Sequence, residues 1–192
     1  LLTAMDGWVT DGTEPPASRY PRIDDETLVD IKEFCQQFPR IPGVGLPKDY
    51  YRPLRLDHGP RWHSDGLASV VPPKIGPAYQ TLVPAIDRDG NELAGIRLPD
   101  VAVPLATYMG WNLRAEEYGV GGILAGLDGS YLEFPRTPVD RQQARDPRLS
   151  IRERYPSREV YLEKYARAIQ RLQKNRLLLE DDAIQMFEQA AG

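Results

Sequence analysis

The amino-acid sequence predicts a mixed α and β fold with long irregular connections, and three observations support this. The 18 prolines all lie between Pro15 and Pro156, which is typical of loops and short strands because proline fixes φ and lacks an amide donor. A turn signal separates two β-prone runs. Helical periodicity marks both ends of the chain. We therefore divide the chain into three parts: a terminal helix at 1–12, a proline-rich α and β region at 13–156, and C-terminal helices at 157–192.

The first part carries apolar residues at helical spacing. One face of the predicted helix holds Leu1, Met5, Trp8 and Val9. Gly12 is suited to end the helix, because glycine readily adopts the left-handed conformation that follows a last helical turn. No capping residue precedes the helix. We expect it to be the end of a helix that starts in a longer protein, followed by an extended connector at 13–23.

The next segment is expected to be a short helix over residues 24–37. Asp24 is a suitable cap, and apolar residues follow at helical spacing from Leu28 to Phe38. Cys35 is the single cysteine, which excludes an internal disulfide and a thiolate zinc site. We expect Cys35 to be a small core residue. Residues 39–77 contain many prolines and are expected to be irregular.

Residues 79–98 predict a β-hairpin. The runs 79–86 and 91–98 are β-prone, and they flank Asp87-Arg-Asp-Gly90. An Asp-Gly pair in a short polar loop between such runs is a strong turn signal. Pro84 favours an edge position or a bulge for the first run, because it cannot donate to a neighbouring strand.

The remaining residues form an apolar stretch, a loop, a charged linker and finally two helices. An apolar stretch at 98–113 is followed by a glycine-rich loop at 114–135 and a charged linker at 146–156. Ser157 then caps a helix. Its apolar stripe comprises Tyr161, Tyr165, Ala168, Ile169 and Leu172. A last short helix opens at Glu180-Asp-Asp182 and carries Ile184, Phe187 and Ala191.

Net charge and hydropathy limit the classes of binding partner that the chain can have. The net charge is −4, and acidic and basic residues alternate, which argues against nucleic acid and against an anionic membrane surface. No apolar run approaches the length of a membrane span. The sequence assigns no compartment, cytoplasmic or exported. A dense arginine series runs from Arg136 to Arg158, interrupted by acids, and favours a solvated, salt-bridged surface over a phosphate-binding patch.

No cofactor or metal is expected. Gly119-Val-Gly-Gly122 resembles a dinucleotide-binding loop, but Leu124 occupies the place of the third glycine, so a flexible loop is the better interpretation. The two histidines lie in Asp57-His-Gly-Pro-Arg-Trp-His-Ser-Asp65, whose spacing matches no standard metal-ligand motif.

That histidine segment nevertheless supplies the weak catalytic candidates. They are His58, His63, Asp57 and Asp65, because histidine beside a carboxylate is suited to acid–base chemistry. The alternative, which we favour, is that these residues are solvated or form turns in a proline-rich loop. None of the six serines lies in the Gly-x-Ser-x-Gly elbow that exposes a hydrolase nucleophile. The nearest setting, Leu127-Asp-Gly-Ser-Tyr131, is more typical of a turn.

Candidate pocket residues lie in the apolar stretch. Tyr108, Trp111 and Asn112 are expected to line a substrate pocket, since an aromatic wall beside an amide combines apolar surface with one polar group. The alternative, which is at least as strong, is that Trp111 is a core residue.

Several segments together resemble the large, mostly bacterial proteins described as α/β-hydrolase domain-containing proteins. The resemblance includes Met5-Asp-Gly-Trp-Val-Thr-Asp-Gly12, Phe38-Pro-Arg-Ile-Pro-Gly-Val44, Leu82-Val-Pro-Ala-Ile-Asp-Arg-Asp-Gly90 and Ile151-Arg-Glu-Arg-Tyr-Pro-Ser-Arg158. In that family these segments lie at the C-terminal end. The resemblance therefore implies that the chain is the C-terminal part of an α/β-hydrolase-type protein, with nucleophile, acid and histidine upstream of Leu1. Where family members have an aromatic before Gly-Pro, this chain has His58, which argues against His58 as a shared catalytic group.

Three functions follow as hypotheses. In the first, the chain covers the core or shapes the pocket of a serine esterase-like hydrolase acting on a small ester-like substrate, and is inactive alone. In the second, it is an independent binding module that associates with the upstream core or with itself through an exposed apolar face. In the third and weakest, it is an enzyme that uses its two histidines.

Overall fold

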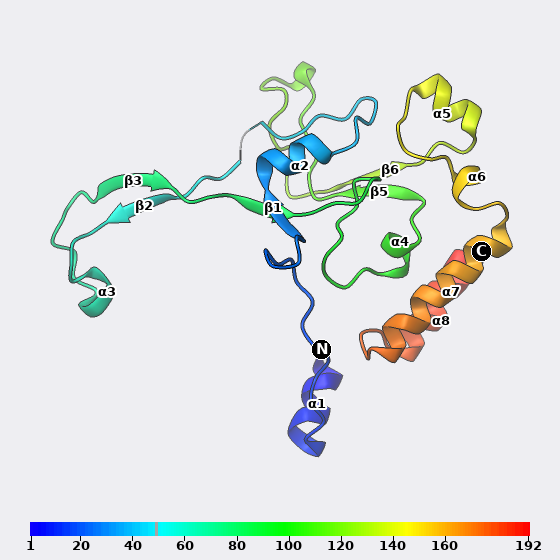
Figure 1. Cartoon of the computed structure of the whole chain (residues 1–192), viewed down its shortest axis with the longest axis horizontal. Coiled ribbons are helices and arrows are strands. Elements are labelled where there is room, and N and C mark those ends of the chain that lie inside the picture. Colours follow the sequence, from blue (N-terminus) through cyan, green and yellow to red (C-terminus); the bar gives the residue numbers. More distant parts are fainter. Residues whose placement is uncertain (49) are drawn as a thin grey trace.

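The computed structural model describes residues 1–48 and 50–192, in which short helices and strands are joined by long connections (Figure 1). The elements are α1 (Leu2–Asp11), β1 (Leu28–Asp30), α2 (Ile31–Gln37), β2 (Leu54–Asp57), α3 (Trp62–Asp65), β3 (Lys74–Ala78), β4 (Leu82–Pro84), α4 (Pro99–Ala102), β5 (Ala106–Met109), the 3₁₀ turn η1 (Glu116–Tyr118), β6 (Ser130–Glu133), α5 (Pro138–Ala144), α6 (Ile151–Arg154), α7 (Arg158–Lys174) and α8 (Glu180–Ala191). The predicted mixed α and β class is confirmed.

The sheets are small. Strands pair as β1 with β4, β2 with β3 and β5 with β6, and each pair is a separate two-stranded sheet. Every strand pairing in the described part of the chain is antiparallel. The pair β2–β3, with α3 at its tip, extends as an arm away from the other elements (Figure 1). All of the arm except Ala78 falls within residues 39–77, so the expectation that this whole stretch is irregular was wrong.

The predicted helix over 24–37 begins later than expected. Asp24 pairs with Arg22 instead of capping a helix, and residues 28–30 form β1, whose Val29 lies opposite Val83 of β4. The helix starts after Asp30, whose carboxylate accepts from the amide of Lys32 at 2.7 Å. Strand pairing with a distant segment therefore overrides the local helical spacing.

The predicted hairpin over 79–98 is reduced to its turn. The turn closes as expected, with one bridge between Ile86 and Glu92, but 91–98 forms no strand. Asn91 explains this. Its buried side-chain amide donates to the carbonyl of Ala106 at 3.1 Å, and its side-chain oxygen accepts from the amide of Tyr108 at 2.8 Å. The second run is thereby held against β5, while β4 pairs with β1.

Two other expectations need correction. The loop predicted at 114–135 contains η1 and also β6, which pairs with β5 along its whole length. The linker predicted at 146–156 contains α6, whose N-terminus has a capping box of Ser150 and Glu153. Cys35 is exposed, not part of the core, because α2 turns Phe34 and Phe38 toward the interior.

Both ends of the chain are helical as predicted. Gly12 adopts the left-handed conformation at φ 70°, and its amide donates to the carbonyl of Trp8 at 3.1 Å. The side chain of Ser157 accepts from the amide of Val160. Helices α7 and α8 lie side by side (Figure 1). The described residues include no helix long and apolar enough to cross a bilayer.

Two clusters of buried apolar residues hold the fold. The first joins α4, α7 and α8, and comprises Val103, Tyr155, Tyr165, Ala168, Ile169 and Ala183. The predicted stripe of the C-terminal helix supplies much of it. The second joins α2 to β5 and to the 38–46 segment, and comprises Phe38, Ile41, Ile86 and Met109. Residues of α1 join neither cluster, and none of them is buried.

Candidate functional site

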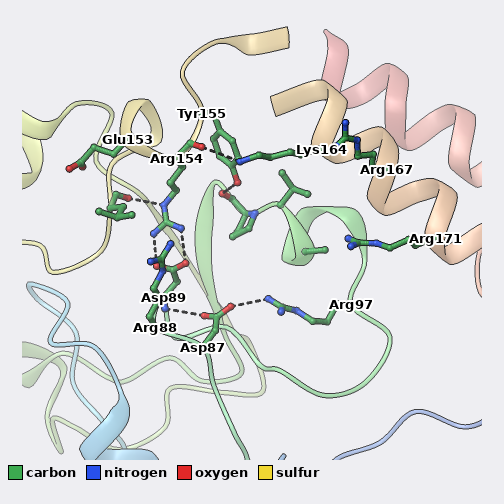
Figure 2. A pocket seen from close by; sticks show the side chains of 14 residues that line it. Asp87, Arg88, Asp89, Arg97, Glu153, Arg154, Tyr155, Lys164, Arg167 and Arg171 are labelled. Carbon is green, nitrogen blue, oxygen red and sulfur yellow. Dashed lines mark hydrogen bonds and ion pairs between the residues drawn. The ribbon is translucent and has the colours of Figure 1, made fainter. Parts of the chain in front are cut away.

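A cavity of about 540 Å³ opens between the 87–90 turn, α4, α6 and α7 (Figure 2). We call it the basic cavity, because six cationic side chains line it against three acidic ones. The cations are Arg88, Arg97, Arg154, Lys164, Arg167 and Arg171, and the acids are Asp87, Asp89 and Glu153. Ala102, Val103, Pro104, Leu149 and Tyr155 complete the lining.

One wall of the cavity is the 87–90 turn. A carboxylate oxygen of Asp87 accepts from the amides of Asp89 and Asn91, each at 3.0 Å. Gly90 has a φ of 85°, and a Cβ built there lies 3.0 Å from Cγ2 of Thr107. The turn thus requires glycine for both conformation and space. It holds Asp87, Arg88 and Asp89 in fixed positions at the cavity.

Two of the cations are fixed by acids of this turn. Arg97 Nη2 donates to Asp87 Oδ2 and to the carbonyl of Val101, both at 2.9 Å. Its Nε is buried and has no hydrogen-bond acceptor among the described residues. Arg154 makes a two-point ion pair with Asp89, and both side chains are 7% exposed. Arg154 also donates through Nε to the carbonyl of Leu149 at 2.9 Å.

The third acid, Glu153, is bound by groups outside the cavity. Its Oε2 accepts from the amide and the hydroxyl of Ser150 at 2.8 and 2.6 Å. Arg141 Nε lies 3.2 Å from the same oxygen. The Ser150 hydrogen bonds hold the pKa of Glu153 below its ordinary value. Glu153 is therefore an ionised cap of α6 and not a proton donor.

Helix α7 supplies the opposite wall. Lys164 Nζ donates to the carbonyl of Arg154 at 3.3 Å and lies 5.2 Å from the ring centroid of Tyr155. Arg167 pairs with Glu163 on the helix surface. Arg171 reaches from α7 toward the same opening (Figure 2). The α7 wall therefore adds positive charge without adding a lining acid.

The tyrosines near the cavity remain neutral. Burial raises the pKa of Tyr155 to about 12, and burial together with the charge of Asp100 raises the pKa of Tyr161 to about 12. Tyr165 donates from its hydroxyl to Asp100 at 3.0 Å. Proton abstraction near neutral pH is thus unfavourable for these phenols.

The four weak catalytic candidates lie on the arm, remote in sequence from the residues of the basic cavity. His58 stacks on Trp62 with ring centroids 4.4 Å apart. Asp57 accepts from the amide of Gly59 at 2.8 Å, and Asp65 pairs with Arg61 at 2.8 Å. His63 is exposed. The carboxylates thus serve a turn and a surface ion pair, and no hydrogen bond joins them to an imidazole among the described residues.

The three pocket candidates separate in the structure. Trp111 packs against Phe34 and Phe38 with centroids 5.9 and 5.4 Å away, and its Nε1 donates to the carbonyl of Gly45 at 3.2 Å. This supports the core interpretation of Trp111. Asn112 is exposed. Tyr108 packs edge-on against Tyr131 at 5.4 Å. None of the three lines the basic cavity.

Sequence reasoning missed the basic cavity. Its cations come from the turn, the segment before α4, α6 and α7. Only Arg154 belongs to the arginine series that was predicted to be solvated. That prediction was wrong for two members. Arg154 and Arg148 are 7% and 3% exposed, each in an ion pair. The alternation of acid and base in 146–154 signals salt bridges, but it does not show that they are buried.

Comparison with known proteins places the chain in a family. A family model described as an alpha/beta hydrolase domain matches residues 1–188. The chain belongs to this family. The α/β-hydrolase domain resembles no curated protein and no solved structure closely enough to match. The family therefore rests on the sequence match over nearly the whole chain.

Three of the six serines of this α/β-hydrolase domain occupy structural positions. Ser130 Oγ donates to the carbonyl of Trp111 at 2.9 Å, while Ser150 and Ser157 cap helices. No hydrogen bond joins a serine hydroxyl to His58 or His63 in the described part of the chain. Nor do three His, Cys, Asp or Glu side chains converge there as a metal ion would require.

Proposed function

We propose that this chain is the C-terminal portion of a serine esterase-like α/β-hydrolase, which covers the core or shapes its pocket and does not itself supply the nucleophile. The substrate is a small ester-like molecule, and the reactive serine belongs to a separate hydrolase core. Two observations together support the proposal: the match to the family, and the sequence that flanks each serine. A hydrolase nucleophile needs a strained turn between a strand and a helix, and none of the six serines is flanked by the required glycines.

The sheets give independent support. An α/β-hydrolase core builds its nucleophile elbow on a sheet covered by helices, whereas the described residues pair only as antiparallel two-stranded sheets. Small sheets joined by long connections are suited to a layer over another domain. The basic cavity then provides the surface that such a layer presents to a ligand.

An ester assay tests this proposal. The chain alone, incubated with p-nitrophenyl acetate and butyrate with and without divalent metal, should release nitrophenol at the rate of the buffer. Adding the chain to a core of the same family that contains Gly-x-Ser-x-Gly should change the KM or kcat of that core. Turnover by the chain alone that a His58→Ala, His63→Ala double variant abolishes would contradict the proposal and favour the self-sufficient enzyme.

A specific observation favours the interaction module as a second candidate. Helix α1 leaves its apolar side chains in solvent, with Leu2 84%, Val9 80% and Trp8 51% exposed. Contiguous exposed apolar surface is typical of association sites. In this alternative the chain binds a hydrolase core or a second copy of itself through α1.

Light scattering after size-exclusion chromatography tests whether the chain is an interaction module that associates through α1. The unsubstituted chain should self-associate with increasing concentration, and Leu2→Glu with Val9→Glu should make it monomeric. Leu127→Glu serves as the matched control, since Leu127 lies outside α1 and its side chain is fully exposed. A monomer at all concentrations, with no binding to a core, would contradict the module.

A further inference from the structure

The basic cavity holds more positive charge than its own acids neutralise. Asp89 is paired with Arg154, and Asp87 with Arg97. Glu153 is occupied by Arg141, which does not line the cavity. After these pairings Arg88, Lys164 and Arg171 have no carboxylate within salt-bridge distance among the described residues. Each of the three is solvent-exposed at the opening.

The positions of these cations are defined by the surrounding structure. Arg88 lies in the turn that Asp87 and Gly90 fix. Lys164 and Arg171 lie on α7, whose buried side is packed in the first apolar cluster through Tyr165 and Ile169. Two rigid elements therefore hold like charges on opposite sides of one cavity. Mutual repulsion of such charges raises the free energy of the empty site, and a bound anion offsets it.

The lining also selects the kind of anion. The volume of about 540 Å³ lies in the range of small-molecule sites, roughly 300–1,000 Å³. Guanidinium groups bind carboxylate and phosphate oxygens through paired hydrogen bonds. Next to them, Ala102, Val103 and Pro104 provide an apolar surface for the carbon skeleton of a ligand.

We infer that the basic cavity is a binding site for a small organic anion, whose carboxylate or phosphate oxygens contact Arg88 and Arg171 while its carbon skeleton packs on Val103. Lys164 contributes a further positive charge at the Tyr155 side (Figure 2). The site goes beyond the proposed hydrolytic role, because binding of the anion requires neither a nucleophile nor a second domain.

Calorimetric titration of the full chain with two probes, citrate and inorganic phosphate, tests the site. Saturable binding of at least one probe is expected, with an affinity that falls as sodium chloride is added, since the cavity is open to solvent. The probe that binds more tightly identifies the anionic group as a carboxylate or a phosphate. Because no turnover is measured, failure of the ester assay leaves this result unaffected.

Two double variants of equal charge change provide the control. Arg88→Gln with Arg171→Gln should weaken binding by about tenfold or more, because the charge-assisted hydrogen bonds from both guanidinium groups to the anion are removed. Arg19→Gln with Arg52→Gln removes two arginines that do not line the cavity, and should change the affinity by less than about twofold. Absence of saturable binding by both probes, or equal weakening in the two variants, would overturn the inference.

Discussion

Arg154 and Asp89 form a buried ion pair between residues 65 positions apart in the sequence. Arg154 Nη1 donates to Asp89 Oδ2 at 2.6 Å, and a second contact joins Nη2 to Oδ1. The guanidinium carbon lies 4.0 Å from the ring centroid of Phe134. This pair connects the 87–90 turn to α6, and so fixes two walls of the basic cavity relative to each other.

Removing one partner of this pair should be strongly destabilising. Asp89→Ala leaves the Arg154 charge buried without a counter-ion, which typically costs about 3–5 kcal/mol in the free energy of unfolding. Urea denaturation measures the change. Asp65→Ala, which removes the exposed partner of Arg61, is the control and should cost less than about 1 kcal/mol. Equal losses in the free energy of unfolding of the two variants would show that the buried Arg154–Asp89 pair contributes no more to stability than the exposed pair.

Arg148 should not tolerate lysine. Its guanidinium donates to Asp146, to Thr107 Oγ1 at 2.9 Å and to the carbonyls of Leu132 and Glu133 at 2.9 and 3.1 Å. An ammonium group cannot reach these acceptors together, and each one left unsatisfied costs about 1–3 kcal/mol. Chemical denaturation of Arg148→Lys is therefore expected to show a loss above about 2 kcal/mol. The exposed Arg152→Lys should be nearly neutral, and a neutral Arg148→Lys would contradict the assignment.

Alanine substitutions at Gly90 and Gly43 distinguish the cost of backbone strain from the cost of steric conflict. Both have positive φ, 85° and 76°, but a Cβ on Gly90 lies 3.0 Å from Thr107 and 3.2 Å from Phe38, whereas one on Gly43 has no neighbour within 4 Å. Gly43→Ala should cost about 1–2 kcal/mol for the left-handed backbone alone. Gly90→Ala should cost about 1–3 kcal/mol more, because the site is already filled. Calorimetric melting of both variants gives the comparison, and similar losses would refute the packing argument.

Stability should fall at alkaline pH. The pKa of Tyr155 is raised by burial from 10 to about 12, so the folded state keeps a proton that the unfolded chain releases. The contribution is fully present below about pH 10 and is lost as the pH rises toward about 12. Denaturation midpoints measured across this interval should decline less steeply in Tyr155→Phe. An unchanged slope would show that Tyr155 does not couple folding to pH.

The helices at both ends could be predicted because their signals are local. Ser157 caps α7 within three residues, and the stripe through Tyr165 and Leu172 repeats at helical spacing. The turn ending in Gly90 was likewise visible in four consecutive residues. In each case, the residues that determine the conformation are neighbours in the sequence.

The strand partners and the cavity could not be predicted because they depend on distant residues. β1 and β4 have three residues each and lie about fifty positions apart. The side chain of Asn91, which holds the second run against β5, gives no signal in a hydropathy pattern. Likewise, the arginine series showed the charges of Arg148 and Arg154 but not their burial, which comes from Asp89, Thr107 and Phe134.

Covalent labelling tests the proposal that this chain does not carry the hydrolase nucleophile. The chain is incubated with excess alkyl fluorophosphonate, which modifies activated serines, and its intact mass is measured beside a serine esterase as positive control. An unchanged mass is expected for the chain, and a single adduct is expected for the esterase. Stoichiometric modification of any one of the six serines would contradict it.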